Sequence, residues 1–195
     1  MPTPTPPPQP PLAALLSVVL KTHTRDVHDR LDQHLLKQRI FASRERYLCF
    51  LRVQWHFHEA VASLDRSADA AAGRLQLIVH DLADLGARPP TAHGWRPSLH
   101  VASPAAALGW HYVAEGSTLG AAVLLKAAAA LDLHGRYGAR HLAPSPLGVA
   151  EYWRRARERL DAVALDSTGQ SQACAGASDA FQFVRRCVDE EFSFE

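Results

Sequence analysis

Two glycines interrupt a long apolar helical stretch, GWHYVAEGSTLGAAVLLKAA, which spans Gly109–Ala128. Glycine inside a helix costs about 1 kcal/mol relative to alanine, so Gly116 and Gly120 need a structural or functional reason. Residues four apart lie on one face of a helix. Two explanations stay open from the sequence: a tight helix crossing or a kink, or a flat ligand that lies against exposed peptide groups.

The composition limits what this chain can do. With 195 residues, of which 47% are hydrophobic, we expect one domain with a single core. The 21 basic and 20 acidic side chains give a net charge of +1, which argues against a nucleic-acid partner. Cys49, Cys174 and Cys187 fit neither a disulfide framework nor a zinc-site spacing, and this pattern favours a reducing, cytoplasmic compartment.

The N-terminal segment MPTPTPPPQPP, residues 1–11, is rich in proline and is predicted to form a flexible tail before a domain over residues 12–195. The apolar run Leu12–Leu20 is short and is not followed by the small residues of a signal cleavage site. No apolar run approaches the roughly 20 residues that span a bilayer, so we expect no membrane partner.

Apolar residues recur at intervals of three and four along the rest of the chain, and no stretch of useful length alternates as a β-strand does. The sequence therefore predicts an all-α fold with one broken helix. The predicted helices cover Leu12–Leu36, Ser43–Leu64, Ala70–Leu85, Ser103–Leu133, Leu147–Leu165 and Ser178–Phe192. Ser43 and Ser103 are expected N-caps, Gly86 is an expected C-terminal stop, and residues 87–103 form a surface connection.

His28 is the candidate metal ligand among eleven histidines. It shares a helical row with Thr24, Leu31 and Leu35 at the edge of an apolar face, where an imidazole can point into a pocket. A lone histidine in such a place is more often a hydrogen-bonded core residue. Six histidines are expected in solvated or capping positions: His34, His80, His93, His100, His134 and His141. His56 and His58 flank an apolar stripe and have no matching metal partner.

A haem (heme) site needs an axial ligand, a shaped distal wall, apolar contact with the macrocycle and cations for two propionates. His28 can supply the ligand, and the face of Gly116 and Gly120 can supply the wall. Lys21 lies seven residues before His28, two helical turns away on the same side, where it can reach a propionate. In isolation, a solvated lysine is the simpler interpretation of Lys21.

Three further side chains complete the candidate site. Arg154 can serve the second carboxylate, although an arginine-rich helix face is usually just solvated. Tyr112 lies one turn before the first kink glycine and can present a hydroxyl at the pocket edge, and Phe181 is a candidate ring contact, but both residue types are common in ordinary cores. Glu115 and Asp81 are possible acids without a pattern that pairs them. No phosphate-binding loop, zinc spacing or nucleophile elbow competes with this interpretation.

Six segments carry a family resemblance over most of the chain. TRDVHDRL at Thr24–Leu31 is similar to a proximal-helix motif around an axial histidine, and LGWHYVAEGSTLGAAVLLKAA is similar to a distal-helix motif. The other four are HDLADLG at His80–Gly86, YGARHLAP at Tyr137–Pro144, YWRRARERLD at Tyr152–Asp161 and GASDAFQF at Gly176–Phe183. Together they resemble bacterial haem oxygenases of the biliverdin-producing group.

The resemblance implies an all-α domain with haem, both substrate and cofactor, between the first helix and a kinked distal helix. It places the iron ligand on His28, the catalytic distal wall on Gly116 and Gly120, and further haem contacts on Thr24 and Ser117. The implied reaction cleaves haem with dioxygen and external electrons, and it yields biliverdin, carbon monoxide and ferrous iron.

The resemblance also bears on regiochemistry and partners. Lys21 with Tyr112 is similar to the arrangement in enzymes that open the α-meso carbon. Many animal-type enzymes have a distal aspartate, whereas the nearest acid here is Glu115, so the proton relay has no assigned residue. Because the chain has no flavin or iron–sulfur motif, electrons must come from a ferredoxin or a flavin reductase, and a bilin-accepting phytochrome is a further candidate partner. A non-catalytic haem carrier or sensor, and a helical interaction protein without haem, are the alternatives.

Overall fold

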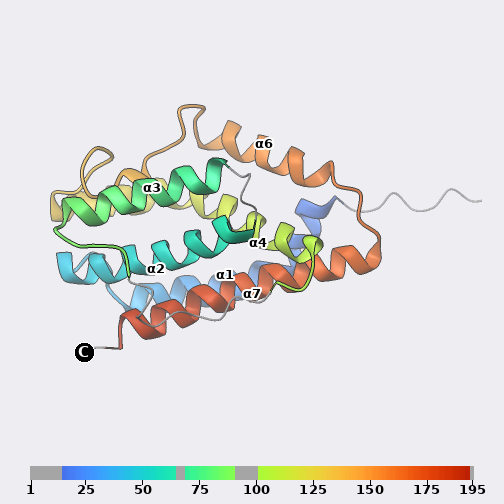
Figure 1. Ribbon diagram of the computed structural model, residues 1–195, viewed down its shortest axis with the longest axis horizontal. Helices are drawn as coiled ribbons and strands as arrows, with labels where there is room; N and C mark the ends of the chain where they lie inside the picture. Colours follow the sequence, from blue (N-terminus) through green and yellow to red (C-terminus); the bar gives the residue numbers. More distant parts are fainter. Residues whose placement is uncertain (1–14, 65–68, 91–100, 194–195) are drawn as a thin grey trace, which may run out of the picture.

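Helices account for almost all of the regular structure in the described part of the chain (Figure 1). The computed structural model describes residues 15–64, 69–90 and 101–193, without the side chains of residues 69–72. No strand occurs within these ranges, where His134 forms isolated bridges with Tyr137 and Gly138. The all-α prediction is confirmed. The predicted tail over residues 1–11 and the predicted helix start at Leu12 lie outside the described residues.

The first three helices follow the predicted periodicity. They are α1 (Leu16–Lys37), α2 (Arg44–Leu64) and α3 (Asp69–Asp84). Ser43 caps α2, because its Oγ accepts the backbone N–H of Arg46 at 3.3 Å. After α3 the chain turns at Gly86, whose φ of +71° lies in the left-handed region that favours glycine. Both predicted helix boundaries, at Ser43 and at Gly86, are confirmed.

The glycine-interrupted stretch forms two helices joined by a kink. Its elements are α4 (Pro104–Gly116), the 3₁₀ turn η1 (Ser117–Leu119), α5 (Ala121–Ala128) and the 3₁₀ turn η2 (Ala129–Leu131). Ser103 caps α4 by accepting the N–H of Ala106 at 3.2 Å, and Pro104 occupies the first turn, as predicted. The segments before and after Gly120 differ in direction by 48°. The predicted broken helix is therefore confirmed.

The last helix is longer than predicted. The 3₁₀ turn η3 (Arg140–Leu142) is followed by α6 (Val149–Asp161) and α7 (Ser167–Glu191). The sequence predicted that the last helix begins at Ser178, and this prediction is wrong. Asp166 caps α7 by accepting the N–H of Gly169 at 2.7 Å. The turns before Ser178 contain small and polar residues instead of a stripe of large apolar side chains, so periodicity did not reveal them.

α7 crosses α4 at very short range through a pair of glycines. A Cβ atom on Gly109 would lie 2.1 Å from the carbonyl oxygen of Ala173, and one on Gly176 would lie 2.0 Å from that of Ala106. Real Cβ atoms essentially never come this close to another atom, so both positions require glycine. A tight helix crossing does exist in this protein, but Gly109 and Gly176 form it and the kink glycines do not.

Buried apolar side chains form two clusters. One lies between α1, α2, α4 and α7, and in it Trp110 stacks on Phe57 with 6.0 Å between ring centroids. The other lies between α2, α3 and α5, and it includes Tyr47 and Phe50, both at most 1% exposed. Because α2 contributes to both clusters, it joins the α4–α7 pair to the α3–α5 side of the molecule.

α1 and α7 run side by side along one edge of the molecule, and α3 and α6 lie along the opposite edge (Figure 1). Side-chain hydrogen bonds link α1 to α7, from His23 to Ser178 at 2.9 Å and from His34 to Asp189 at 2.7 Å. α6 contacts both α1 and α4. Among the described helices, none is by itself long and apolar enough to cross a bilayer; the bent pair formed by α4–η1 and α5–η2 meets the length and composition criteria only jointly.

Candidate functional site

His28 lies on the solvent side of α1, next to α7. Its side chain is 57% exposed, and its ring meets the ring of Phe181 edge-on with 5.8 Å between centroids. Nδ1 lies 3.2 Å from Oδ2 of Asp32, one turn further along, and 4.0 Å from Oδ1 of Asp29. A carboxylate beside Nδ1 favours the neutral tautomer with its proton on that nitrogen, and Nε2 then keeps a lone pair for a metal.

The two kink glycines have ordinary helical backbones. Gly116 has φ −64° and ψ −30°, and Gly120 has φ −82° and ψ −14°. A Cβ atom on Gly120 would meet nothing within 4 Å, and one on Gly116 would only touch the ring of Trp153 at 3.8 Å. Neither backbone conformation nor packing within the described chain therefore requires glycine at these positions. Gly120 leaves open space over its peptide group, which is what a flat ligand needs, whereas the ring of Trp153 lies beside Gly116.

Tyr112 marks the place where α1 and α4 meet. It is half-buried, and its ring centroid lies 5.7 Å from that of Trp153 on α6. Burial raises the pKa of Tyr112, and a hydrogen bond with Thr24 opposes this rise. Thr24 itself is buried and donates to the carbonyl of Leu20 at 2.8 Å. His28 follows Thr24 by one turn and Gly116 follows Tyr112 by one turn, so both candidate walls lie one turn from this contact.

Trp153 is a contributor that the sequence did not single out. It stood there only within the segment YWRRARERLD, yet its ring packs against that of Tyr112 and lies 3.8 Å from the position of a Cβ atom on Gly116. A tryptophan within an arginine-rich helical segment carries no specific sequence signal of this contact. Only the packing of α6 on α4 reveals it.

The two cations predicted for carboxylates differ in their surroundings. Lys21 is exposed and forms no ion pair with a described residue. Arg154 donates from Nε to Glu151 at 2.7 Å and also pairs with Glu158, and both carboxylates raise the pKa of Arg154. The structure thus brings Arg154 to acids of its own helix and not to the other predicted residues. Its role at a propionate stays a prediction.

Ser117 and Glu115 complete the region around the kink. Ser117 is exposed, and its hydroxyl donates to the carbonyl of Ala114 at 2.7 Å. Glu115 is 23% exposed, and its Oε1 lies 3.5 Å from Nη2 of Arg159. Burial, together with a hydrogen bond to Glu115, raises the pKa of Tyr152 to about 12. The acid nearest to the kink glycines therefore ties α4 to α6, and the proton relay still has no assigned residue.

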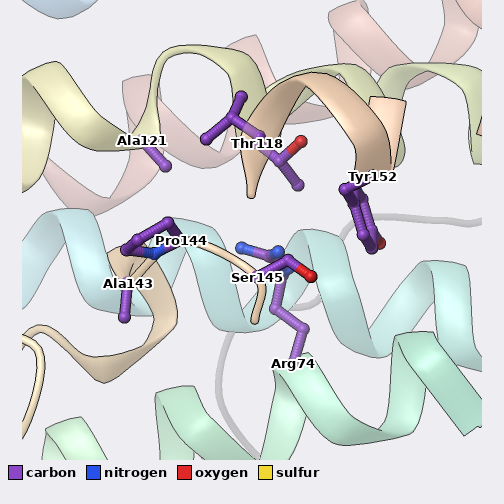
Figure 2. Close-up of a pocket in the computed structure, with 8 residues that line it drawn as sticks. Arg74, Thr118, Ala121, Ala143, Pro144, Ser145 and Tyr152 are labelled. Carbon is purple, nitrogen blue, oxygen red and sulfur yellow. The ribbon is translucent and has the colours of Figure 1, made fainter. Parts of the chain in front are cut away.

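A small hollow lies beside the kink (Figure 2). Its lining residues are Arg74, Thr118, Ala121, Ala143, Pro144, Ser145, Val149 and Tyr152. Figure 2 shows the side chain of Arg74 extending from α3 toward Ser145. The empty volume is about 240 Å³ with open solvent included, which is below the roughly 300–1,000 Å³ of typical small-molecule sites. We therefore assign this hollow to the packing that supports the kink and not to a porphyrin.

The sequence also missed a buried polar cluster around Asp81, which is fully buried. Its carboxylate faces Nδ1 of His141 at 2.8 Å and accepts the backbone N–H groups of Arg140 and His141 at 2.8 and 3.0 Å. His141 was predicted to have a solvated or capping role; it is 2% exposed and bound to Asp81, so the prediction of a solvated side chain is wrong. Burial lowers the pKa of His141, and it holds the pKa of His58 well below its ordinary range. The one available signal was an acid inside the apolar helical segment HDLADL.

Comparisons with known proteins find a matching family model and relatives that share the fold. The family model described as Heme oxygenase matches residues 78–190. The chain is 37% identical to "Heme oxygenase PigA" of Pseudomonas aeruginosa (strain PAO1) over 189 residues. The matched region covers 92% of this chain and 94% of the relative. The NO- and CO-bound heme oxygenase of Neisseria meningitidis superposes with a TM-score of 0.83 at 37% identity over 94% of each chain. The heme oxygenase of Leptospira interrogans, with a TM-score of 0.67 at 16% identity over 90% of this chain and 99% of that chain, shares the fold.

Proposed function

This chain belongs to the haem oxygenase family, and we propose that it binds haem between His28 of α1 and the kinked segment that carries Gly116 and Gly120. The protein degrades haem to biliverdin, carbon monoxide and ferrous iron, with haem as both substrate and cofactor. The reaction uses dioxygen and electrons from a separate reductase. When bound, haem supplies the iron and the oxygen chemistry, and the protein supplies ligation, orientation and electrostatics.

One observation carries the placement of haem: the bare, open face at the kink. A Cβ atom on Gly120 would meet nothing within 4 Å, so the protein's own packing does not use this space. His28 is exposed and has a carboxylate beside Nδ1, which supports iron ligation through Nε2. A macrocycle that lies over bare peptide groups and is ligated from the other side would use both features.

We assign the remaining predicted residues to the edge of the same site. Phe181 contacts the His28 ring and would contact the macrocycle as well. Thr24 and Tyr112 hold α1 to α4 at the pocket edge, and the exposed Ser117 lies within the kink. Lys21 would bind a propionate. The presence of Lys21 on α1 and Tyr112 on α4 supports the proposal that haem is cleaved at its α-meso carbon.

The identity of the partners is a separate proposal. We expect a ferredoxin or a flavin reductase as the electron donor, and a phytochrome as one acceptor of the bilin. The predicted reducing, cytoplasmic compartment is supported by Cys49, Cys174 and Cys187, which form no disulfide bond with one another.

A hemin titration followed by reductant in air tests this function. We expect hemin to give the Soret band of a histidine-ligated haem, and reductant with air to convert it to a bilin spectrum. The variant His28→Ala should lose the histidine-ligated band. A Soret band that persists under turnover conditions would point to a haem carrier or sensor, and hemin spectra unchanged by His28→Ala would contradict the proposed site.

A further inference from the structure

The hollow beside the kink is lined by a cation and by no acid among the described residues (Figure 2). Its lining residues come from α3, from η1 and the start of α5, from the loop between η3 and α6, and from the first turn of α6. Arg74 is the only charged residue among them. The volume of about 240 Å³, open solvent included, is too small for a porphyrin but exceeds the roughly 30 Å³ that one water molecule occupies in the liquid. The hollow therefore has room for a small ion.

The guanidinium of Arg74 is held in place at this hollow. Its Nη1 donates to the carbonyl of His141 at 2.7 Å, and the backbone N–H of His141 is in turn bound to the buried carboxylate of Asp81 at 3.0 Å. Figure 2 shows the rest of the side chain extending from α3 toward Ser145. A guanidinium has several N–H donors, so one bond to a carbonyl leaves others for a second acceptor. The hollow thus contains a cation that is already oriented before a ligand binds.

The charge of Arg74 has no carboxylate partner within the described part of the chain. Arg74 is half-buried and forms no ion pair with a described residue, whereas Arg140 of η3 is bound to Asp84. Burial lowers the pKa of His58 and His141, and the charge of Arg74 acts on both in the same direction. Removing a charge from water is costly unless an opposite charge lies beside it. An anion in the hollow would offset this cost.

Ser145 offers a second hydrogen-bond donor at the same hollow. Its Oγ accepts the backbone N–H of Leu147 at 3.3 Å, and its hydroxyl donates to no described residue. Pro144 and Pro146 flank Ser145 and fix φ on both sides of it, so this loop loses little conformational freedom when a ligand binds. An arginine together with a hydroxyl group suits an oxyanion, because the guanidinium fork can bind two oxygen atoms at once.

Two acids of the adjoining helices are already paired with arginines outside the hollow. Glu115 of α4 forms a hydrogen bond with Tyr152, and its Oε1 lies 3.5 Å from Nη2 of Arg159. Glu151, in the first turn of α6, is bound to Arg154. Their negative charges are therefore partly neutralised and do not compensate the cation in the hollow.

We propose that this hollow binds a small inorganic oxyanion, such as phosphate, through the guanidinium of Arg74 and the hydroxyl of Ser145. A bound oxyanion would join α3 to the loop before α6 and would contact the kink at Thr118 and Ala121, which line the same hollow. It would form part of the packing that supports the kink. The site uses neither His28 nor the space over Gly120, so this inference goes beyond the proposed function and does not depend on haem.

Thermal unfolding of the full chain without hemin tests the site. Phosphate replaces chloride step by step at constant ionic strength. We expect the melting temperature to rise and then to saturate, because a ligand that binds only the folded state stabilises it. The rise is expected for phosphate over chloride, since a halide cannot accept two parallel hydrogen bonds from a guanidinium through separate oxygen atoms. A melting temperature that does not change, or that rises without saturation, would overturn the proposal.

Substitutions test the two donors, with phosphate binding measured by calorimetry. Arg74→Gln should weaken binding about tenfold or more, Arg74→Lys should restore part of the affinity, and Ser145→Ala should weaken binding about two- to tenfold. Arg157→Gln is the matched control and should bind phosphate as the wild type does, since Arg157 is an exposed arginine that does not line the hollow. Melting temperatures in chloride show whether each variant folds. If Arg74→Gln does not fold, Ser145→Ala decides. Equal phosphate affinities of Ser145→Ala and wild type, or equal losses in Arg74→Gln and Arg157→Gln, would overturn the proposal.

Discussion

Oδ2 of Asp32 lies 3.2 Å from Nδ1 of His28, one helical turn further along α1, and Oδ1 of Asp29 lies at 4.0 Å from the same nitrogen. A carboxylate next to Nδ1 orients a metal-bound imidazole and increases its basicity. We expect Asp32→Asn to weaken hemin binding by about tenfold, the lower end of the range for such partners because this pair is exposed. Asp29→Asn is the matched control and should have a smaller effect. Equal hemin affinities of Asp32→Asn and wild type would contradict a role for this contact.

Gly120→Ala should separate folding from haem binding. Alanine adds no clash and suits the helical backbone at this position, so we expect the free energy of unfolding to rise by about 0.4–1 kcal/mol. If haem lies against the bare peptide, the added methyl group should weaken hemin binding about tenfold, because overpacking costs about 1–3 kcal/mol. Gly73→Ala in α3 is the control, since a Cβ there also meets nothing within 4 Å. It should stabilise the fold and leave hemin binding unchanged. Unaltered hemin affinity in Gly120→Ala would argue against the proposed wall.

Gly109→Ala should have the opposite effect on folding. The added Cβ would lie 2.1 Å from the carbonyl oxygen of Ala173, and this backbone atom cannot move without shifting α7. We expect a loss of about 1–3 kcal/mol or more in the free energy of unfolding, measured by urea denaturation. A free energy of unfolding equal to that of the wild type would mean that α4 and α7 pack less closely than the Gly109–Ala173 approach indicates.

Features that depend on local signals were predictable from the sequence. Ser103 and Pro104 lie at the start of the helix that they begin, and the kink glycines lie inside the helix that they interrupt. A few neighbouring residues are therefore enough to predict each of these features. The early turns of α7 lack such a signal. Their small residues become helical because they pack on α4 through the Gly109–Gly176 crossing, which joins distant segments.

The candidate site also combines residues that local sequence motifs predict with residues whose contacts depend on the packing of distant segments. The motif around His28 was sufficient to nominate it, but the sequence could not show that the guanidinium of Arg154 is bound to Glu151 and Glu158 of its own helix. Likewise, His141 is buried only because Asp81, which is 60 residues away in the chain, is placed against it.

The buried histidines predict a loss of stability in acid. Burial holds the pKa of His58 well below its ordinary value of about 6.5, so below that pH the unfolded chain binds a proton that the folded chain does not. The contribution of His58 to stability is therefore complete above about pH 6.5 and is lost as the pH falls below it. Between pH 7.5 and 5.5 one such histidine costs about 1.4 kcal/mol. Urea unfolding at both pH values should show that His58→Phe loses less stability than wild type by about this amount. Parallel losses in the two proteins would mean that His58 accepts a proton in the folded state.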